Sequence, residues 1–208
     1  MEIGMFRCSR PVFMIVLLMV LSTGGSAQRH QIGFFLNAAG FFPAQDNIGN
    51  GFGSGLGAVF YISQNVSIAF EWKYSRFSVA KKEGEFLNGT LTATPLLASI
   101  RYKIQTGTFF SPYIFGGGGL FFNTMSLDER LSPEDKNVKK QEIKNGLGLY
   151  GGIGSSFKIN ERISLFIEGL YLIRKAGVET ILVDNSPGQT FKANLRFLSV
   201  LIGLEYFY

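Results

Sequence analysis

The sequence predicts an all-β chain that folds as an eight-stranded antiparallel up-and-down transmembrane β-barrel. Several segments alternate apolar and polar side chains with the period of a strand, whereas no segment of comparable length has a helical period. The connections between these segments alternate between short turns and longer polar loops. With 208 residues, 46% of them hydrophobic and 17% charged, the chain fits one folded domain and excludes disorder.

Residues 1–27 have the features of a cleaved secretory signal peptide. Arg7 and Arg10 precede an apolar run, Val12–Leu21, and small residues then continue to Ala27. The run is shorter than the roughly 20 residues that a membrane-spanning helix needs. Because Cys8, the only cysteine, would leave with this peptide, we expect an exported mature chain, residues 28–208, without a disulfide bond.

The mature chain divides into eight predicted strands. They are Gln31–Phe42, Gly51–Ile62, Val66–Phe77, Thr90–Lys103, Phe110–Asn123, Lys144–Ile159, Ile163–Ile173 and Leu198–Tyr208. The third has the clearest pattern, because Phe70 and Trp72 flank Glu71 in a strict alternation of large apolar and polar residues. The last two strands repeat this pattern, and the other five show it more weakly.

The lengths of the connections support a meander. Short turns are predicted at Ser63–Asn65, Gln105–Thr108 and Asn160–Arg162, and longer loops at Pro43–Asn50, Ser78–Gly89, Thr124–Ile143 and Lys175–Thr190. Short turns at one end and long loops at the other are typical of membrane barrels with periplasmic turns and extracellular loops. The predicted strands, of 11–16 residues, are also at least as long as the 9–11 residues that a tilted membrane strand requires.

Charged residues fall on the strand faces predicted to line the lumen. These residues are Glu71, Lys73, Arg101, Lys103, Glu168 and Glu205. They share their faces with Ser, Ala and Gly, whereas the opposite faces carry the large apolar residues that suit lipid. Because the positions have similar heights above the short turns, we expect a cluster in which the charges neutralise one another.

The stretch "GLGLYG", Gly146–Gly151, matches the glycine spacing of a dinucleotide-binding turn. It follows a charged loop, however, and no helix comes after it to hold a pyrophosphate. We therefore interpret Gly146, Gly148, Gly152 and Gly154 as inward positions that leave room for large neighbours in a small barrel.

The signal peptide, the eight segments and the closing "GLEYFY" together resemble the small eight-stranded outer-membrane barrels of Gram-negative bacteria, the OmpA and OmpX type of the porin family. The resemblance implies a location in the bacterial outer membrane, reached by export with a cleaved N-terminal signal peptide. Gly203, Tyr206 and Tyr208 match the terminal pattern that the barrel assembly machinery reads in this family. Leu201 departs from it, since a polar residue is usual there.

For function we favour a structural or surface-interaction role carried by extracellular loops, with a closed or nearly closed lumen, because side chains just fill a ring of eight strands. The alternative is a narrow channel for small or hydrophobic solutes, as in the related OmpW type. A lipid A modifying enzyme is less favoured, since the only histidine, His30, lies at the mature N-terminus, away from any nucleophile. We expect no enzymatic activity, no cofactor and no metal site.

Cationic residues near the predicted outer rim give a candidate for lipid contact. They are Lys81, Lys82, Lys175, Lys192 and Arg196. Long cationic side chains can reach lipopolysaccharide phosphates, although solvated lysines without a fixed partner are an equal alternative. The formal net charge of +5 does not require a nucleic-acid partner. We expect outer-membrane lipid, the barrel assembly machinery and an extracellular ligand held by the loops as partners.

Overall fold

The computed structural model describes residues 32–80, 87–127, 138–183 and 187–208, so the predicted signal peptide lies outside the described residues. The regular secondary structure of the described residues is entirely β-strand. The strands are β1 Ile32–Pro43, β2 Ile48–Tyr61, β3 Val66–Val79, β4 Gly89–Lys103, β5 Phe110–Leu127, β6 Val138–Ile143, β7 Gly146–Lys158, β8 Ile163–Leu182 and β9 Pro187–Phe207. These segments contain no helix with the length and apolarity needed to cross a membrane.

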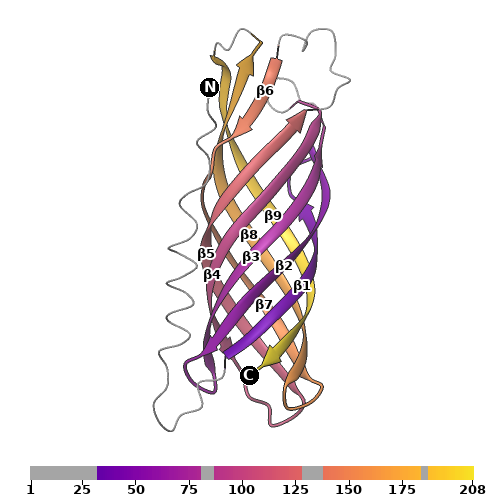
Figure 1. The fold of residues 1–208 in the computed structure, drawn as a ribbon, viewed down its shortest axis with the longest axis vertical. Helices are drawn as coiled ribbons and strands as arrows, with labels where there is room; N and C mark the ends of the chain where they lie inside the picture. The colour runs from indigo at the N-terminus through magenta and orange to yellow at the C-terminus, as the bar shows by residue number, and fades with distance from the viewer. Residues whose placement is uncertain (1–31, 81–86, 128–137, 184–186) are drawn as a thin grey trace, which may run out of the picture.

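Eight of the nine strands form a closed antiparallel ring in the order β1-β2-β3-β4-β5-β7-β8-β9. The first strand closes the ring by pairing with the last, from Gly33↔Phe207 to Pro43↔Phe197. The strands tilt around the axis of a tall barrel (Figure 1). The predicted eight-stranded up-and-down barrel is therefore confirmed.

Two predicted loops were wrong in part, because they contain strands. The predicted loop Thr124–Ile143 contains the end of β5 and all of β6, and in the described part of the chain β6 forms a backbone ladder with β8 alone. The predicted loop Lys175–Thr190 consists largely of β8 and β9, which stay paired as far as Ile181↔Pro187. These three strands project beyond the rest of the barrel (Figure 1). Outward residues become polar there, so the apolar alternation ends although the backbone ladder continues.

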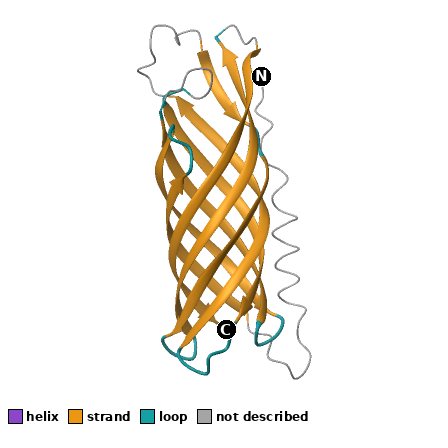
Figure 2. Ribbon diagram, turned by 180° about the vertical axis from the view of Figure 1, so that it is seen from behind, coloured by secondary structure: helices purple, strands orange, loops and turns teal. Residues whose placement is uncertain are grey.

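The three short connections, residues 62–65, 104–109 and 159–162, lie at the same end of the barrel as the C-terminus (Figure 2). We call this end the turn end and the opposite end, which carries the projecting strands, the loop end. Gly107 has a φ of 69°, a conformation that side chains other than glycine rarely adopt. A glycine at this position therefore allows the turn between β4 and β5 to close.

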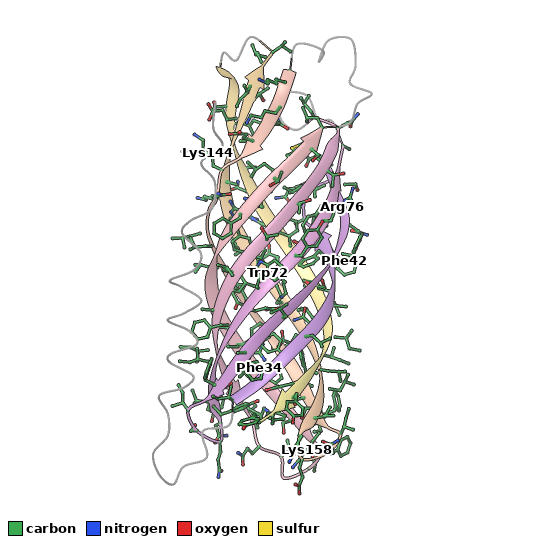
Figure 3. All side chains as sticks on the ribbon, in the orientation of Figure 1. Phe34, Phe42, Trp72, Arg76, Lys144 and Lys158 are labelled. Carbon is green, nitrogen blue, oxygen red and sulfur yellow. The ribbon has the colours of Figure 1, made fainter. Side chains whose placement is uncertain are left out.

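The two faces of each strand differ in exposure. Phe34, Phe42 and Trp72 stand on the outside of the ribbon (Figure 3), and Trp72 is 47% exposed while its neighbour Glu71 is 8% exposed. Large apolar residues thus cover the outside of the barrel, as the alternation predicted.

The glycine motif Gly146–Gly151 lies inside strand β7, so no strand-to-helix turn exists for a nucleotide. A Cβ atom at Gly154 would lie 2.5 Å from Cζ of Tyr113, and one at Gly152 would lie 2.7 Å from Cζ of Phe115. Both aromatic rings point into the lumen, so these two glycines make room for large neighbours as predicted, whereas a Cβ atom at Gly146 would have only Arg174 Nη2 near it, at 3.8 Å.

Candidate functional site

The lumen has two halves of opposite chemistry. Toward the turn end, the inward positions hold most of the charged, hydroxyl and amide side chains together with a small apolar cluster around Phe35 and Phe166, and toward the loop end they hold mainly aromatic and aliphatic ones. The first half contains the charged residues that the sequence singled out. The second half contains a cavity that the sequence did not indicate.

All six predicted lumen residues face the interior, five of them buried and Lys103 partly buried. Lys73 Nζ lies 3.1 Å from Glu71 Oε1, two positions away on the same strand. Arg101 Nη2 lies 3.2 Å from Glu168 Oε1, so this pair joins β4 to β8 across the lumen. We call these six residues the charged layer.

Neutral polar groups complete the charged layer. The Tyr61 hydroxyl donates to Glu205 Oε1 at 3.0 Å and accepts from Lys103 Nζ at 3.3 Å, so it connects two charges that form no direct pair. The Tyr113 hydroxyl donates to Glu168 Oε1 at 2.7 Å.

The amide of Asn37 donates to Glu71 Oε1 at 2.7 Å. Sequence reasoning missed Tyr61, Tyr113 and Asn37, although Asn37, with Leu36 and Ala38 on either side, occupies a polar inward position that alternation could have identified.

Aromatic rings surround the central cation of this layer. The Arg101 Cζ atom lies 5.2 Å from the ring centroid of Phe35, 5.7 Å from that of Tyr113 and 6.0 Å from that of Phe115. Arg101 is 8% exposed. The guanidinium is therefore buried inside the lumen with three aromatic rings close to it.

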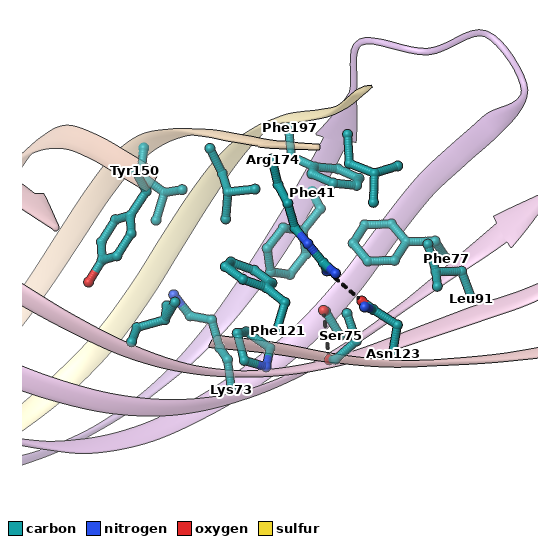
Figure 4. A pocket seen from close by; sticks show the side chains of 16 residues that line it. Phe41, Lys73, Ser75, Phe77, Leu91, Phe121, Asn123, Tyr150, Arg174 and Phe197 are labelled. Atoms are coloured by element: carbon teal, nitrogen blue, oxygen red, sulfur yellow. Dashed lines mark hydrogen bonds between the residues drawn. The ribbon is translucent and has the colours of Figure 1, made fainter. Parts of the chain in front are cut away.

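The apolar half of the lumen encloses a cavity of about 40 Å³ toward the loop end (Figure 4). We call it the loop-end cavity. Its lining residues are Phe41, Lys73, Ser75, Phe77, Leu91, Ala93, Pro95, Leu97, Phe121, Asn123, Tyr150, Leu170, Leu172, Arg174, Leu195 and Phe197. A volume of this size has room for about three water molecules or for one end of a slender molecule, whose remainder would extend toward the loop end.

Glycines of β2 make room for the aromatic rings of the cavity wall. A Cβ atom at Gly51 would lie 2.4 Å from Cδ1 of Phe77, and one at Gly53 would lie 2.9 Å from Cε2 of Phe41. The rings of Phe77 and Phe197 lie 4.9 Å apart, between their centroids. Sequence reasoning missed this wall, although "LYLI", Leu170–Ile173, is apolar on both faces of its strand.

The barrel wall has a seam beside this cavity. The ladder between β5 and β7 ends at Phe121↔Gly146, and beyond it β5 and β6 run side by side without a ladder in the described residues. Side chains bridge the seam instead, since the backbone N–H of Asn123 donates to Asn145 Oδ1 at 3.0 Å. Arg174 adds two further hydrogen bonds here.

Three of the five cationic residues predicted for lipid contact lie together on the outside of β8 and β9. Lys175 pairs with Asn194, so Lys192 and Arg196 are its diagonal neighbours across the ladder. All three are exposed, and within the described ranges none has a carboxylate within 4.0 Å. Lys81 and Lys82 lie outside the described residues.

The residues of the predicted assembly signal have different surroundings. Gly203 faces inward, and a Cβ atom there would lie 2.3 Å from Cζ of Phe166. Tyr206 faces outward and is 43% exposed, while the terminal Tyr208 is 92% exposed. Gly203 therefore has a packing role in the ring, and recognition by the assembly machinery stays a prediction.

Groups typical of metal or nucleophilic chemistry do not gather in the described part of the chain. Among its residues, no three His, Cys, Asp or Glu side chains are placed to hold a metal ion. His30 and Cys8, the single histidine and the single cysteine, lie outside it. The polar groups of the lumen instead bond to one another.

The chain matches no protein-family model and no curated protein. It is similar in structure to the outer membrane protein OprG of Pseudomonas aeruginosa, with a TM-score of 0.67 and 14% identity over 86% of this chain and 96% of that one. For AlkL, solved in DMPC lipid bilayers, the TM-score is 0.62 and the identity 14%, over 90% of this chain and 94% of that one. For Neisserial surface protein A the TM-score is 0.55 and the identity 16%, over 88% of this chain and 99% of that one. The fold is that of the small eight-stranded outer-membrane β-barrels.

Proposed function

We propose that the chain is a bacterial outer-membrane barrel that binds a small apolar solute in its loop-end cavity. The observation that carries this proposal is the change of chemistry along the lumen, which is apolar around the cavity and charged below it. Small-molecule sites are typically concave, mostly apolar and supplied with a few polar groups. The loop-end cavity has this composition.

The outside of the barrel supports a place in a membrane. Apolar side chains such as Phe34, Phe70 and Trp72 are about half exposed and cover the strands. Toward the loop end this cover stops, since the outward positions of β8 pass from Ile173 to Lys175. In outer-membrane barrels the short turns face the periplasm, so the loop end and its cavity would face the cell exterior.

We further propose that the lumen is closed to free diffusion. The charged layer lies between the loop-end cavity and the turn end, and Lys73, which lines the cavity, is itself bonded to Glu71. A path through the layer would have to separate Arg101 from Glu168, and uncompensated buried charges cost several kcal/mol. The geometry therefore supports binding from the loop end more than a narrow through-channel.

Filling the cavity tests this proposal. Ala93 faces the cavity and Ala98 faces outward on the same strand, so Ala93→Phe places a ring in the cavity and Ala98→Phe is its matched control. With the mature barrel in deuterated detergent micelles, we expect contacts between 1-hexanol and the methyl groups of Leu91 and Leu195, measured as nuclear Overhauser effects. Ala93→Phe should abolish them and Ala98→Phe should keep them. Their absence from the unsubstituted barrel would refute the proposal.

A second proposal concerns the outer leaflet. Lys175, Lys192 and Arg196 form a cationic cluster directly beyond the apolar cover of β8 and β9, where lipopolysaccharide phosphates would lie. We propose that the cluster binds such a phosphate. Changing all three residues to Gln should lower the melting temperature in lipopolysaccharide bilayers but leave it unchanged in phosphatidylcholine. An equal change in both lipids would refute this binding.

Neither proposal includes catalysis. The Ser75 hydroxyl of the cavity donates to the Ala93 carbonyl at 3.1 Å and has no histidine beside it in the described residues. The absence of enzymatic activity is a proposal, and so is a surface interaction carried by the loops. The projecting strands β6, β8 and β9 are among the described segments of the loop end that would present such a surface.

A further inference from the structure

Arg174 is a buried cation in the wall of the apolar loop-end cavity. It points inward from β8 and is 3% exposed, although most of its neighbours in the cavity are apolar (Figure 4). The ring centroid of Phe121 lies 5.1 Å from its Cζ atom. A guanidinium in such surroundings has lost its water and needs another source of stabilisation.

The hydrogen bonds of Arg174 go to neutral groups. Its Nη1 donates to Asn123 Oδ1 at 2.9 Å, and its Nη2 donates to the backbone carbonyl of Lys144 at 2.6 Å. Its buried Nε has no acceptor among the described residues. Within the same residues, no carboxylate lies within 4.0 Å of the guanidinium.

A comparison with the charged layer sets Arg174 apart. The buried or partly buried charged residues that face the described lumen are Lys73, Arg101, Lys103, Arg174, Glu71, Glu168 and Glu205. Lys73 and Arg101 each contact a carboxylate, and Lys103 reaches Glu205 through the Tyr61 hydroxyl. Four cations therefore face three carboxylates, and the cation left without a counter-ion is the one in the cavity wall.

We propose that the loop-end cavity binds a short apolar monocarboxylate, whose carboxylate pairs with Arg174 and whose chain lies among the apolar residues of the cavity. This inference rests on the proposed function of the cavity and names its ligand class. A carboxylate matches the guanidinium because it can accept two parallel hydrogen bonds, one of them from the unsatisfied Nε. The chain would lie against Phe41, Phe77 and Phe197.

A purely structural role for Arg174 is the competing explanation. Its bonds to Asn123 and to the Lys144 carbonyl tie β5 to the segment after β6, across the seam where the ladder is missing. An uncharged donor would satisfy the same amide and carbonyl oxygens, so the positive charge of Arg174 would add nothing to that role. The two explanations differ in whether the cavity distinguishes an acid from an alcohol of the same length.

The test compares hexanoate with 1-hexanol on the mature barrel in deuterated detergent micelles. Arg174→Gln removes the charge but keeps an amide donor, and Arg76→Gln removes an exposed outward charge as the matched control. We expect the unsubstituted barrel and Arg76→Gln to bind hexanoate about tenfold more tightly than hexanol. Arg174→Gln should lose this preference and still bind hexanol. Chemical-shift titration gives the affinities, and the Arg174 Nε–H resonance should shift with hexanoate alone.

Each outcome decides a separate point. If the unsubstituted barrel binds both probes equally, or if Arg174→Gln keeps the preference for hexanoate, the acid site is refuted and the apolar cavity stands. If neither probe binds, the proposed function fails together with the inference. If Arg174→Gln does not give a folded, heat-modifiable band on a gel, Arg174→Lys replaces it. That variant keeps the charge but not the paired geometry, so its hexanoate affinity should fall between the two.

Discussion

The pair Arg101–Glu168 allows a quantitative test of the charged layer. Glu168→Leu removes the carboxylate that lies 3.2 Å from Arg101 Nη2 and also the acceptor of the Tyr113 hydroxyl. Within the described residues no other carboxylate lies within 4.0 Å of Arg101. The variant therefore leaves a buried guanidinium without a counter-ion.

The expected loss follows from these contacts. Removing one partner of a buried pair costs about 3–5 kcal/mol, and the lost hydrogen bond of Tyr113 adds about 1 kcal/mol. The aromatic rings around Arg101 contact the guanidinium before and after the substitution, so they do not enter the difference. We predict that Glu168→Leu lowers the free energy of unfolding by about 4–6 kcal/mol.

Urea unfolding in lipid vesicles, followed by Trp72 fluorescence, measures this loss. The double variant Arg101→Met with Glu168→Leu should be more stable than Glu168→Leu alone, since it removes both charges. The control Glu179→Gln breaks the partly exposed pair with Lys144, of 3.2 Å, and should cost at most about 1 kcal/mol. A loss below 1 kcal/mol for Glu168→Leu, or a double variant weaker than the single one, would refute our account of the layer.

Three further predictions concern packing, conductance and ligand ionisation. Gly154→Ala should lower the free energy of unfolding by about 1–3 kcal/mol in the same assay, because its Cβ would meet the Tyr113 ring. A Cβ at Gly116 would have no atom nearer than 3.9 Å, so Gly116→Ala should cost less than half as much. Equal losses for the two variants would contradict the packing. Single-channel conductance in planar bilayers should stay near zero, and regular open steps would contradict the closed lumen. Hexanoate binding should weaken as the pH falls through the pKa of the hexanoate carboxyl, since the neutral acid offers Arg174 no charge; affinity that is independent of pH would contradict the ion pair.

The outward faces and the ring could be predicted from sequence because lipid imposes a strict period of two. Trp72 and Glu71 show it directly, one exposed to the outside and the other buried inside. Beyond the apolar cover this constraint ends. The sequence pattern therefore predicts a loop where β8 and β9 continue through Lys175 and Lys192, although the backbone ladder persists there.

The cavity escaped prediction for a different reason. Near the loop end, Leu172 faces inward and Ile173 outward, so an apolar residue on each face hides the alternation. Arg174 lies next to Lys175 at the edge of the predicted loop, and nothing in the sequence around it distinguishes it from a solvated cation. Its burial depends on the position of the seam between β5 and β6, which no local pattern encodes.

Fluorescence quenching of Trp72, the only tryptophan, tests the central arrangement most directly. Lipids brominated along their acyl chains should quench it strongly in reconstituted bilayers, and aqueous iodide should not. The variant Trp72→Phe with Phe77→Trp moves the fluorophore to the lumen side of the same strand and should escape bromine quenching. Quenching of the inward fluorophore but not of Trp72 by brominated lipid would mean that the faces are reversed, and the barrel described here would be wrong.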